Sequence, residues 1–228
     1  MTITSLSLLE QALFVIAALV LFASFILLAQ ARLVAAVHAF AWQGAMIATA
    51  TALVATAYDE HHLYISALLT FVLKALLIPW MLHRLIRKLS LRKHIDELAH
   101  PTLVILAGTG LVVFAYWVAL PIEKLEISST RNILAISLAV VLLGLLMMVV
   151  RQQAVAQVLG FMSMENGLFL AAVAATHGMP LIVELGVAFD VLVAMVLFGV
   201  FFFHIHESID SLNVDHLNLL NEWEEEDT

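Results

Sequence analysis

The sequence predicts an all-α, polytopic membrane protein with seven transmembrane helices, an outer N-terminus and a cytoplasmic C-terminus. Hydrophobic residues make up 63% of the 228 residues and charged residues only 12%, whereas soluble domains average about 45–50% and about 25%. The mean hydropathy is +1.04. Apolar windows of roughly twenty residues fill most of the chain, and each is long enough to cross a hydrocarbon layer of roughly 30 Å.

Each apolar window is expected to form a helix, because a helix satisfies its own backbone hydrogen bonds inside lipid. None of the windows alternates apolar and polar residues as barrel strands do. In chain order, the expected spans are 8–29, 33–57, 62–83, 101–120, 131–150, 153–176 and 181–204. The first span is not expected to be a cleaved signal peptide, since no Lys or Arg precedes it.

The basic residues predict the orientation. One set of connections holds seven of the ten Lys and Arg residues, the opposite set holds two, and Lys74 lies inside a span. Because cytoplasmic loops are enriched in Lys and Arg, the N-terminus is predicted to lie outside. We expect four parts, namely a three-helix segment with a basic cytoplasmic loop, a fourth helix with an outer loop, a second three-helix segment and an acidic cytoplasmic tail. Their ranges are 1–100, 101–130, 131–206 and 207–228.

The chain contains no cysteine. It therefore offers no thiolate for an iron–sulfur cluster, no disulfide and no cysteine nucleophile. We expect no catalytic centre, cofactor or metal site of its own, and the apolar composition excludes a nucleic-acid binder. The pair His61 and His62 and the cluster His204, His206 and Glu207 are interpreted as interfacial residues, because each offers two histidines without a matching third ligand.

Four polar residues interrupt the apolar spans at one depth: Lys74, Gln43, Glu165 and Asp190. Counted from the ends of their spans at 1.5 Å per residue, all four lie about 14–17 Å into the membrane. An ionised group at a helix centre costs at least about 2.5–3.5 kcal/mol, so such residues usually have a function. We expect them to face one another and to relay a proton or another cation. The alternative is a static buried ion pair that only fixes helix packing.

Glu184 is a weaker candidate for the same path. It lies about 5 Å inside the outer end of the last span and points roughly 120° away from Asp190. It is interpreted either as a gate for the buried carboxylate or as an ordinary interfacial residue.

Several segments together resemble the membrane subunit called hydrogenase-4 component E. They are RQQAVAQVLGFMSMENG at 151–167, VELGVAFD at 183–190, LNVD at 212–215 and LKALLIP at 73–79. The last three spans are also similar to the small K subunit of respiratory complex I and its counterpart in Mrp-type antiporters. That subunit carries one buried glutamate in each of two helices. By position, Glu165 matches the first and Asp190 matches the second, with Asp in place of Glu.

The resemblance implies a non-catalytic membrane-arm subunit of a hydrogenase-4 or formate-hydrogenlyase-like complex in the cell membrane of a bacterium or archaeon. Its implied partners are antiporter-like membrane subunits, a peripheral hydrogenase module and the lipid bilayer. Such complexes are oxidoreductases that couple electron transfer in peripheral subunits to proton or sodium movement. This chain would then supply buried charges to the ion path and no redox centre.

Two other functions stay open. A self-contained ion-coupled transporter, or an Mrp-type antiporter subunit, would also place charges at the midplane. A retinal-binding protein would use the buried Lys74 as a Schiff base, although such proteins carry the lysine in the last helix. A colourless purified protein would exclude the retinal hypothesis.

Overall fold

The computed structural model describes residues 8–58, 61–88, 101–121, 128–176, 186–196 and 199. All regular secondary structure in these ranges is helical. The labelled elements are α1 (Leu8–Ala29), α2 (Leu33–Tyr58), α3 (His61–Thr70), the π-helix η2 (Phe71–Leu77), α4 (Ile78–Lys88), α5 (Pro101–Ala119), α6 (Ser128–Val150) and α7 (Ala154–Thr176). A further apolar helix, Gly186–Val196, completes the described chain.

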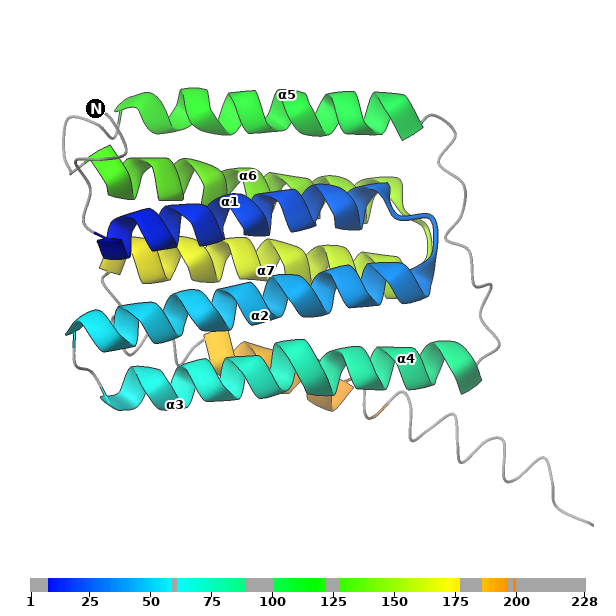
Figure 1. The fold of residues 1–228 in the computed structure, drawn as a ribbon. Helices are drawn as coiled ribbons and strands as arrows, with labels where there is room; N and C mark the ends of the chain where they lie inside the picture. The colour runs from blue at the N-terminus through cyan, green and yellow to red at the C-terminus, as the bar shows by residue number, and fades with distance from the viewer. Residues whose placement is uncertain are drawn as a thin grey trace, which may run out of the picture.

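The helices lie side by side along one direction (Figure 1). Because α3, η2 and α4 follow one another without a break, six described segments are long and apolar enough to cross a membrane. Helices of this length and composition are typical of a membrane protein. The seventh expected span, 181–204, lies partly outside the described residues, and its described part is the helix Gly186–Val196.

The third expected span differs from the structure in two ways. The sequence predicts a helical span over 62–83 that Pro79 interrupts, but the helix continues to Lys88 and contains a π-helical segment. The helix extends beyond the apolar window because Arg, Lys and Leu are good helix formers. The π-helix ends at Leu77, two residues before Pro79, whose ring in a regular α-helix would clash with the carbonyl of Ala75. The wider turns of η2 accommodate this proline.

Close helix contacts define the centre of the bundle. Along α6 and α7, a Cβ at Gly144 would lie only 2.6 Å from the backbone nitrogen of Met164 and 2.7 Å from the carbonyl oxygen of Gly160. The two backbones therefore touch, as in other membrane bundles with small residues at the interface. By contrast, α5 lies at one edge of the bundle (Figure 1), and only 17% of its apolar window is buried.

The buried apolar residues fall into two clusters at opposite ends of the helices. One contains Leu27 and Leu28 of α1, Phe40 of α2 and the first half of α7. The other contains Val20 of α1, the second half of α2 and the last turns of α7. On each of these three helices, buried polar residues lie between the two clusters: Ser24 on α1, Gln43 on α2, and Ser163, Glu165 and Asn166 on α7. These polar residues form a middle layer that holds the candidate site.

Candidate functional site

Lys74 lies at the centre of the polar layer. It belongs to the π-helix η2, and its side chain is fully buried. A Cβ at Gly44 of α2 would lie 2.7 Å from the Cβ of Lys74. The backbones of α2 and η2 therefore approach each other closely, and only a residue without a Cβ fits at position 44. The Cβ of Lys74 packs against the backbone of α2 at this glycine.

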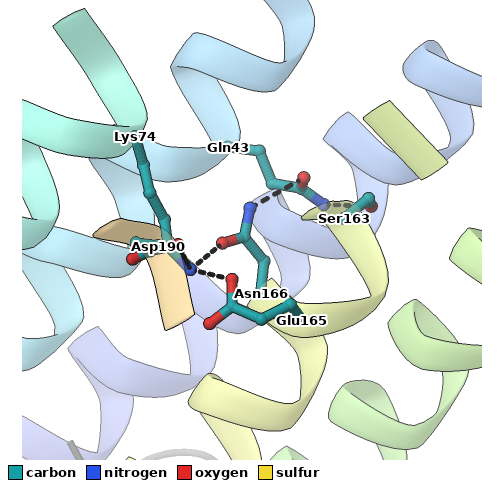
Figure 2. A network of polar contacts seen from close by, with 6 residues as sticks. All are labelled: Gln43, Lys74, Ser163, Glu165, Asn166 and Asp190. Atoms are coloured by element: carbon teal, nitrogen blue, oxygen red, sulfur yellow. Dashed lines mark hydrogen bonds and ion pairs between the residues drawn. The ribbon is translucent and has the colours of Figure 1, made fainter. Parts of the chain in front are cut away.

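Three side chains with oxygen atoms and one aromatic ring surround the ammonium group of Lys74, and Figure 2 shows the first three. The ammonium group donates a hydrogen bond to Oε2 of Glu165 and another, of 2.7 Å, to Oδ1 of Asn166. Oδ1 of Asp190 lies 3.3 Å from Nζ, which makes a second ion pair. The aromatic ring of Phe169 adds a cation–π contact, with its centroid 5.2 Å from Nζ. Two carboxylates, one amide and one ring thus share a single cation.

A chain of amides and hydroxyls continues from this ion cluster toward α1. Asn166 donates from Nδ2 to Oε1 of Gln43 over 3.1 Å. Gln43 in turn donates from Nε2 to the hydroxyls of Ser24, at 2.8 Å, and Ser163, at 3.0 Å. All four of these side chains are buried, so the network satisfies polar groups that would otherwise be costly in lipid. It fixes the amide of Asn166 with its oxygen toward Lys74.

The residues of the site come from elements far apart in the chain. Ser24 lies on α1, Gln43 on α2, Lys74 on η2 and Asp190 on the helix Gly186–Val196. Ser163, Glu165, Asn166 and Phe169 lie on α7. Figure 2 shows the side chains of Lys74, Glu165 and Asp190 pointing toward one another from three different helices.

A pocket of about 240 Å³ adjoins the carboxylate of Glu165. Its walls come from α7 and from the helix Gly186–Val196, and they include the rings of Phe161, Phe169 and Phe189. Glu165 is the one ionisable residue among the described residues that line it. Gly186 allows the close approach of the two helices, since a Cβ there would lie 2.7 Å from the ring of Phe169.

The structure brings together four of the five candidates that the sequence suggests. Lys74, Glu165 and Asp190 form the ion cluster, and Gln43 joins it through Asn166. Glu184 lies outside the described residues, as do His204, His206 and Glu207. Within the described ranges, no group of three or more His, Asp or Glu side chains is placed to hold a metal ion.

Sequence reasoning left out Ser24, Ser163 and Phe169. The two serines are a weak signal, because a hydroxyl in a membrane helix can bond to its own backbone, as Ser24 also does to the carbonyl of Val20 over 2.9 Å. Phe169 is an apolar residue in an apolar span, and only its position over the ammonium group distinguishes it.

Comparison with known proteins places the chain among its relatives. Over 189 residues it is 32% identical to the uncharacterized protein Rv0085 of Mycobacterium tuberculosis, and the match covers 82% of this chain and 86% of that protein. The chain belongs to the family of Rv0085. It is also 25% identical over 181 residues to hydrogenase-4 component E of Escherichia coli K12 and of Shigella flexneri. These matches cover 79% of this chain and 84% of the relatives.

The resemblance to hydrogenase-4 component E inferred from the sequence is thus confirmed as distant homology. No family model matches the chain, and no solved structure matches it significantly.

Proposed function

We propose that this chain is a non-catalytic membrane-arm subunit of a hydrogenase-4 or formate-hydrogenlyase-like complex, and that its buried ion cluster is part of a proton or sodium translocation path. The observation that carries the proposal is a lysine, fully buried among membrane-spanning helices, that two carboxylates from different helices contact. Intramembrane charges of this kind are costly, and they usually mark ion pathways. The distant homology to a hydrogenase-4 component supports the choice of complex.

The geometry suits a relay better than a purely structural ion pair. A structural pair needs one carboxylate for one ammonium, whereas here Glu165 and Asp190 both reach the same nitrogen. Lys74 can therefore change partners without leaving its place. The amide of Asn166 stays bonded to the ammonium at 2.7 Å and would anchor it during that change.

The proposed topology has seven spans, with the N-terminus outside and the C-terminus in the cytoplasm of a bacterial or archaeal cell. In this arrangement the last three spans correspond to the K subunit of complex I, and Glu165 and Asp190 take the places of its two buried glutamates. Glu184 would lie near the outer end of the path. The proposed partners are antiporter-like membrane subunits and a peripheral hydrogenase module.

Redox-linked ion pumping in inverted membrane vesicles tests the proposed role. Asp190→Asn and Glu165→Gln each keep the shape of the side chain and remove its ability to bind and release a proton. We expect the complex to assemble in both variants and the rate of ion pumping to fall at least about tenfold, the factor that an added activation free energy of about 1.4 kcal/mol produces.

Thr51→Val is the matched control for these variants. Thr51 is fully buried and polar, and its hydroxyl bonds to the carbonyl of Ile47 over 3.0 Å on α2, away from the ion cluster. Normal pumping is expected for this variant. Wild-type pumping in both carboxylate variants would instead mean that Glu165 and Asp190 only hold the helices together.

A self-contained ion-coupled transporter is the second candidate, and the π-helix favours it. Transporters build their ion sites at discontinuous helices, and Lys74 lies in a π-helical irregularity of an otherwise continuous helix. Affinity purification from native membranes separates the two candidates. Co-purification with antiporter-like subunits and a nickel–iron hydrogenase module supports the proposed complex, whereas a lone chain that moves ions after reconstitution supports the transporter.

A further inference from the structure

The ion cluster contains one basic and two acidic side chains. Lys74, Glu165 and Asp190 are each at most 9% exposed, and the other polar side chains bonded to the cluster, Asn166 and Gln43, are neutral amides. If all three ionisable groups were charged, the described cluster would carry a net charge of −1. An uncompensated charge in a low-dielectric interior costs several kcal/mol, and in practice such a group takes up a proton instead.

The hydrogen bonds indicate which carboxyl is neutral. Glu165 accepts a hydrogen bond from the ammonium group of Lys74. Asp190 is fully buried, and within the described part of the chain neither of its oxygens has a hydrogen-bond partner. A buried carboxylate without such partners is among the most costly groups in a protein, whereas a protonated carboxyl pays much less.

We infer that the cluster holds one proton on its two carboxyl groups, on Asp190 in the arrangement seen here, and that the ion exchanged at this site is a proton and not sodium. The inference rests on the proposed function, whose ion it names. The protonated cluster is electrically neutral, with Lys74 positive, Glu165 negative and Asp190 uncharged.

The position of Lys74 excludes sodium. Hard cations such as calcium and magnesium are held by about six or more oxygen atoms, and a sodium ion likewise needs a shell of oxygen atoms around it. Here the nearest oxygens, from Glu165, Asn166 and Asp190, all contact the ammonium nitrogen. A sodium ion at the same place would have to displace a positive group that the π-helix and Gly44 hold in position. A proton needs only one oxygen and no cage.

The same contacts define the exchange step. Nζ of Lys74 gives one proton to Glu165, where an O–H bond forms, and takes up the proton of Asp190, whose O–H bond breaks; the ion-pair partner of the ammonium thereby changes from Glu165 to Asp190. Lys74 ends the step with as many protons as it had before, and the cluster is neutral before and after the step. Because one nitrogen already contacts both carboxyl groups, the change requires a small movement of the lysine end group and no movement of the helices.

Infrared difference spectroscopy on the full chain, purified in lipid nanodiscs at neutral pH, counts the buried acid groups. A protonated carboxyl gives a carbonyl band that is separate from carboxylate bands and shifts in heavy water. We expect one such group in the wild type. Asp190→Asn and Glu165→Gln should each lose the band completely, because the remaining carboxylate then balances Lys74. Lys74→Met should double the band, since two acids then lack a cation.

The control and the sodium arm complete the test. Thr51→Val should keep the wild-type band. Addition of sodium chloride in place of potassium chloride should leave the band unchanged. The inference is overturned if the wild type has no band, if the band survives in both carboxylate variants, or if sodium removes it. Pumping measurements test the proposed function separately. If the two carboxylate variants lose pumping but the wild type has no carbonyl band, only the shared proton is contradicted. If the bands behave as expected but both carboxylate variants pump normally, only the proposed ion path is contradicted.

Discussion

The Lys74 ammonium group donates hydrogen bonds to Glu165 and Asn166, and Asp190 lies in ion-pair contact with the same nitrogen. A lysine needs this arrangement inside lipid, because its three donors cannot be left unpaired without a large penalty. The arrangement also depends on where the side chain starts. Its Cβ lies directly against the bare Cα of Gly44, so a glycine on a neighbouring helix determines the position of the charge.

Gly44→Ala tests this dependence. The new Cβ would lie 2.7 Å from the Cβ of Lys74 and 3.1 Å from its carbonyl carbon, so α2 and η2 must move apart. We expect a loss of about 1–3 kcal/mol in the free energy of unfolding, as for other overpacked cores, together with reduced ion pumping. Thermal unfolding of the purified protein in detergent measures the first effect.

Gly110→Ala on α5 is the matched control, because a Cβ there would meet nothing within 4 Å. Alanine is a better helix former than glycine by about 0.8–1.0 kcal/mol, so this variant should be as stable as the wild type or more stable. Equal destabilisation of both variants would show that the contact between Gly44 and Lys74 is unimportant.

The central residues of the site could be predicted from sequence, while their partners could not. Lys74, Glu165 and Asp190 are conspicuous because ionisable groups are rare in apolar spans, and the count of residues from each span end gives a common depth. The contacts of Gln43 with two serines, and of Lys74 with Phe169, depend on the rotation of each helix about its axis. Rotation is set by packing between helices, which one sequence does not reveal.

At the scale of elements, the limits of the helices follow closely from hydrophobicity. The first span is predicted at 8–29 and observed at Leu8–Ala29, and the sixth is predicted at 153–176 and observed at Ala154–Thr176. The π-helix is the main departure. Pro79 indicates an irregularity in the third helix. Whether the helix kinks there or forms a wider π-helical turn depends on the surrounding helices. In the structure it forms the wider turn, in which the amide of Ile78 donates to the carbonyl of Leu73.

The connection between α1 and α2 depends on one charged side chain from another part of the chain. Arg151, between α6 and α7, is 3% exposed and donates from Nη2 to the carbonyls of Leu28, at 2.9 Å, and Gln30, at 3.0 Å. The last carbonyls of a helix have no partner within the helix, and a cation there also interacts favourably with the helix dipole. Arg151 therefore joins the end of α1 to the start of α7.

Arg151→Met keeps most of the side-chain volume and removes both hydrogen bonds. We expect a loss of about 1.5–3 kcal/mol in the free energy of unfolding, the usual range for a hydrogen bond to a charged group. Faster hydrogen exchange at the end of α1 should accompany it. Gln152→Ala, at an exposed neighbouring position, should change neither quantity. Unchanged exchange in α1 of the arginine variant would contradict the capping role.

At the scale of the whole molecule, the polar layer divides the bundle into two apolar halves. Ser24, Gln43 and Ser163 each lie between residues of the two hydrophobic clusters on their own helix. The layer therefore lies near the middle of the helices, the part of a membrane-spanning helix that is farthest from the water on both sides. On the proposed path, an ion that moves to this layer from either side must cross one of the two apolar halves.

The absence of cysteine from the sequence allows a direct test of the seven-span topology, since any introduced cysteine is the only one in the chain. Pro121→Cys, at the exposed end of α5, should react in intact cells with a maleimide that cannot cross membranes. Gln152→Cys, between α6 and α7, should react only after the cells are permeabilised, because the positive-inside rule places it in the cytoplasm. Ser211→Cys decides the number of spans. If the chain crosses the membrane a seventh time after α7, Ser211→Cys should react only after permeabilisation, as Gln152→Cys does. If the chain has six crossings, Ser211→Cys should react in intact cells, as Pro121→Cys does. The second result would also mean that Asp190 lies on a segment that does not span the membrane.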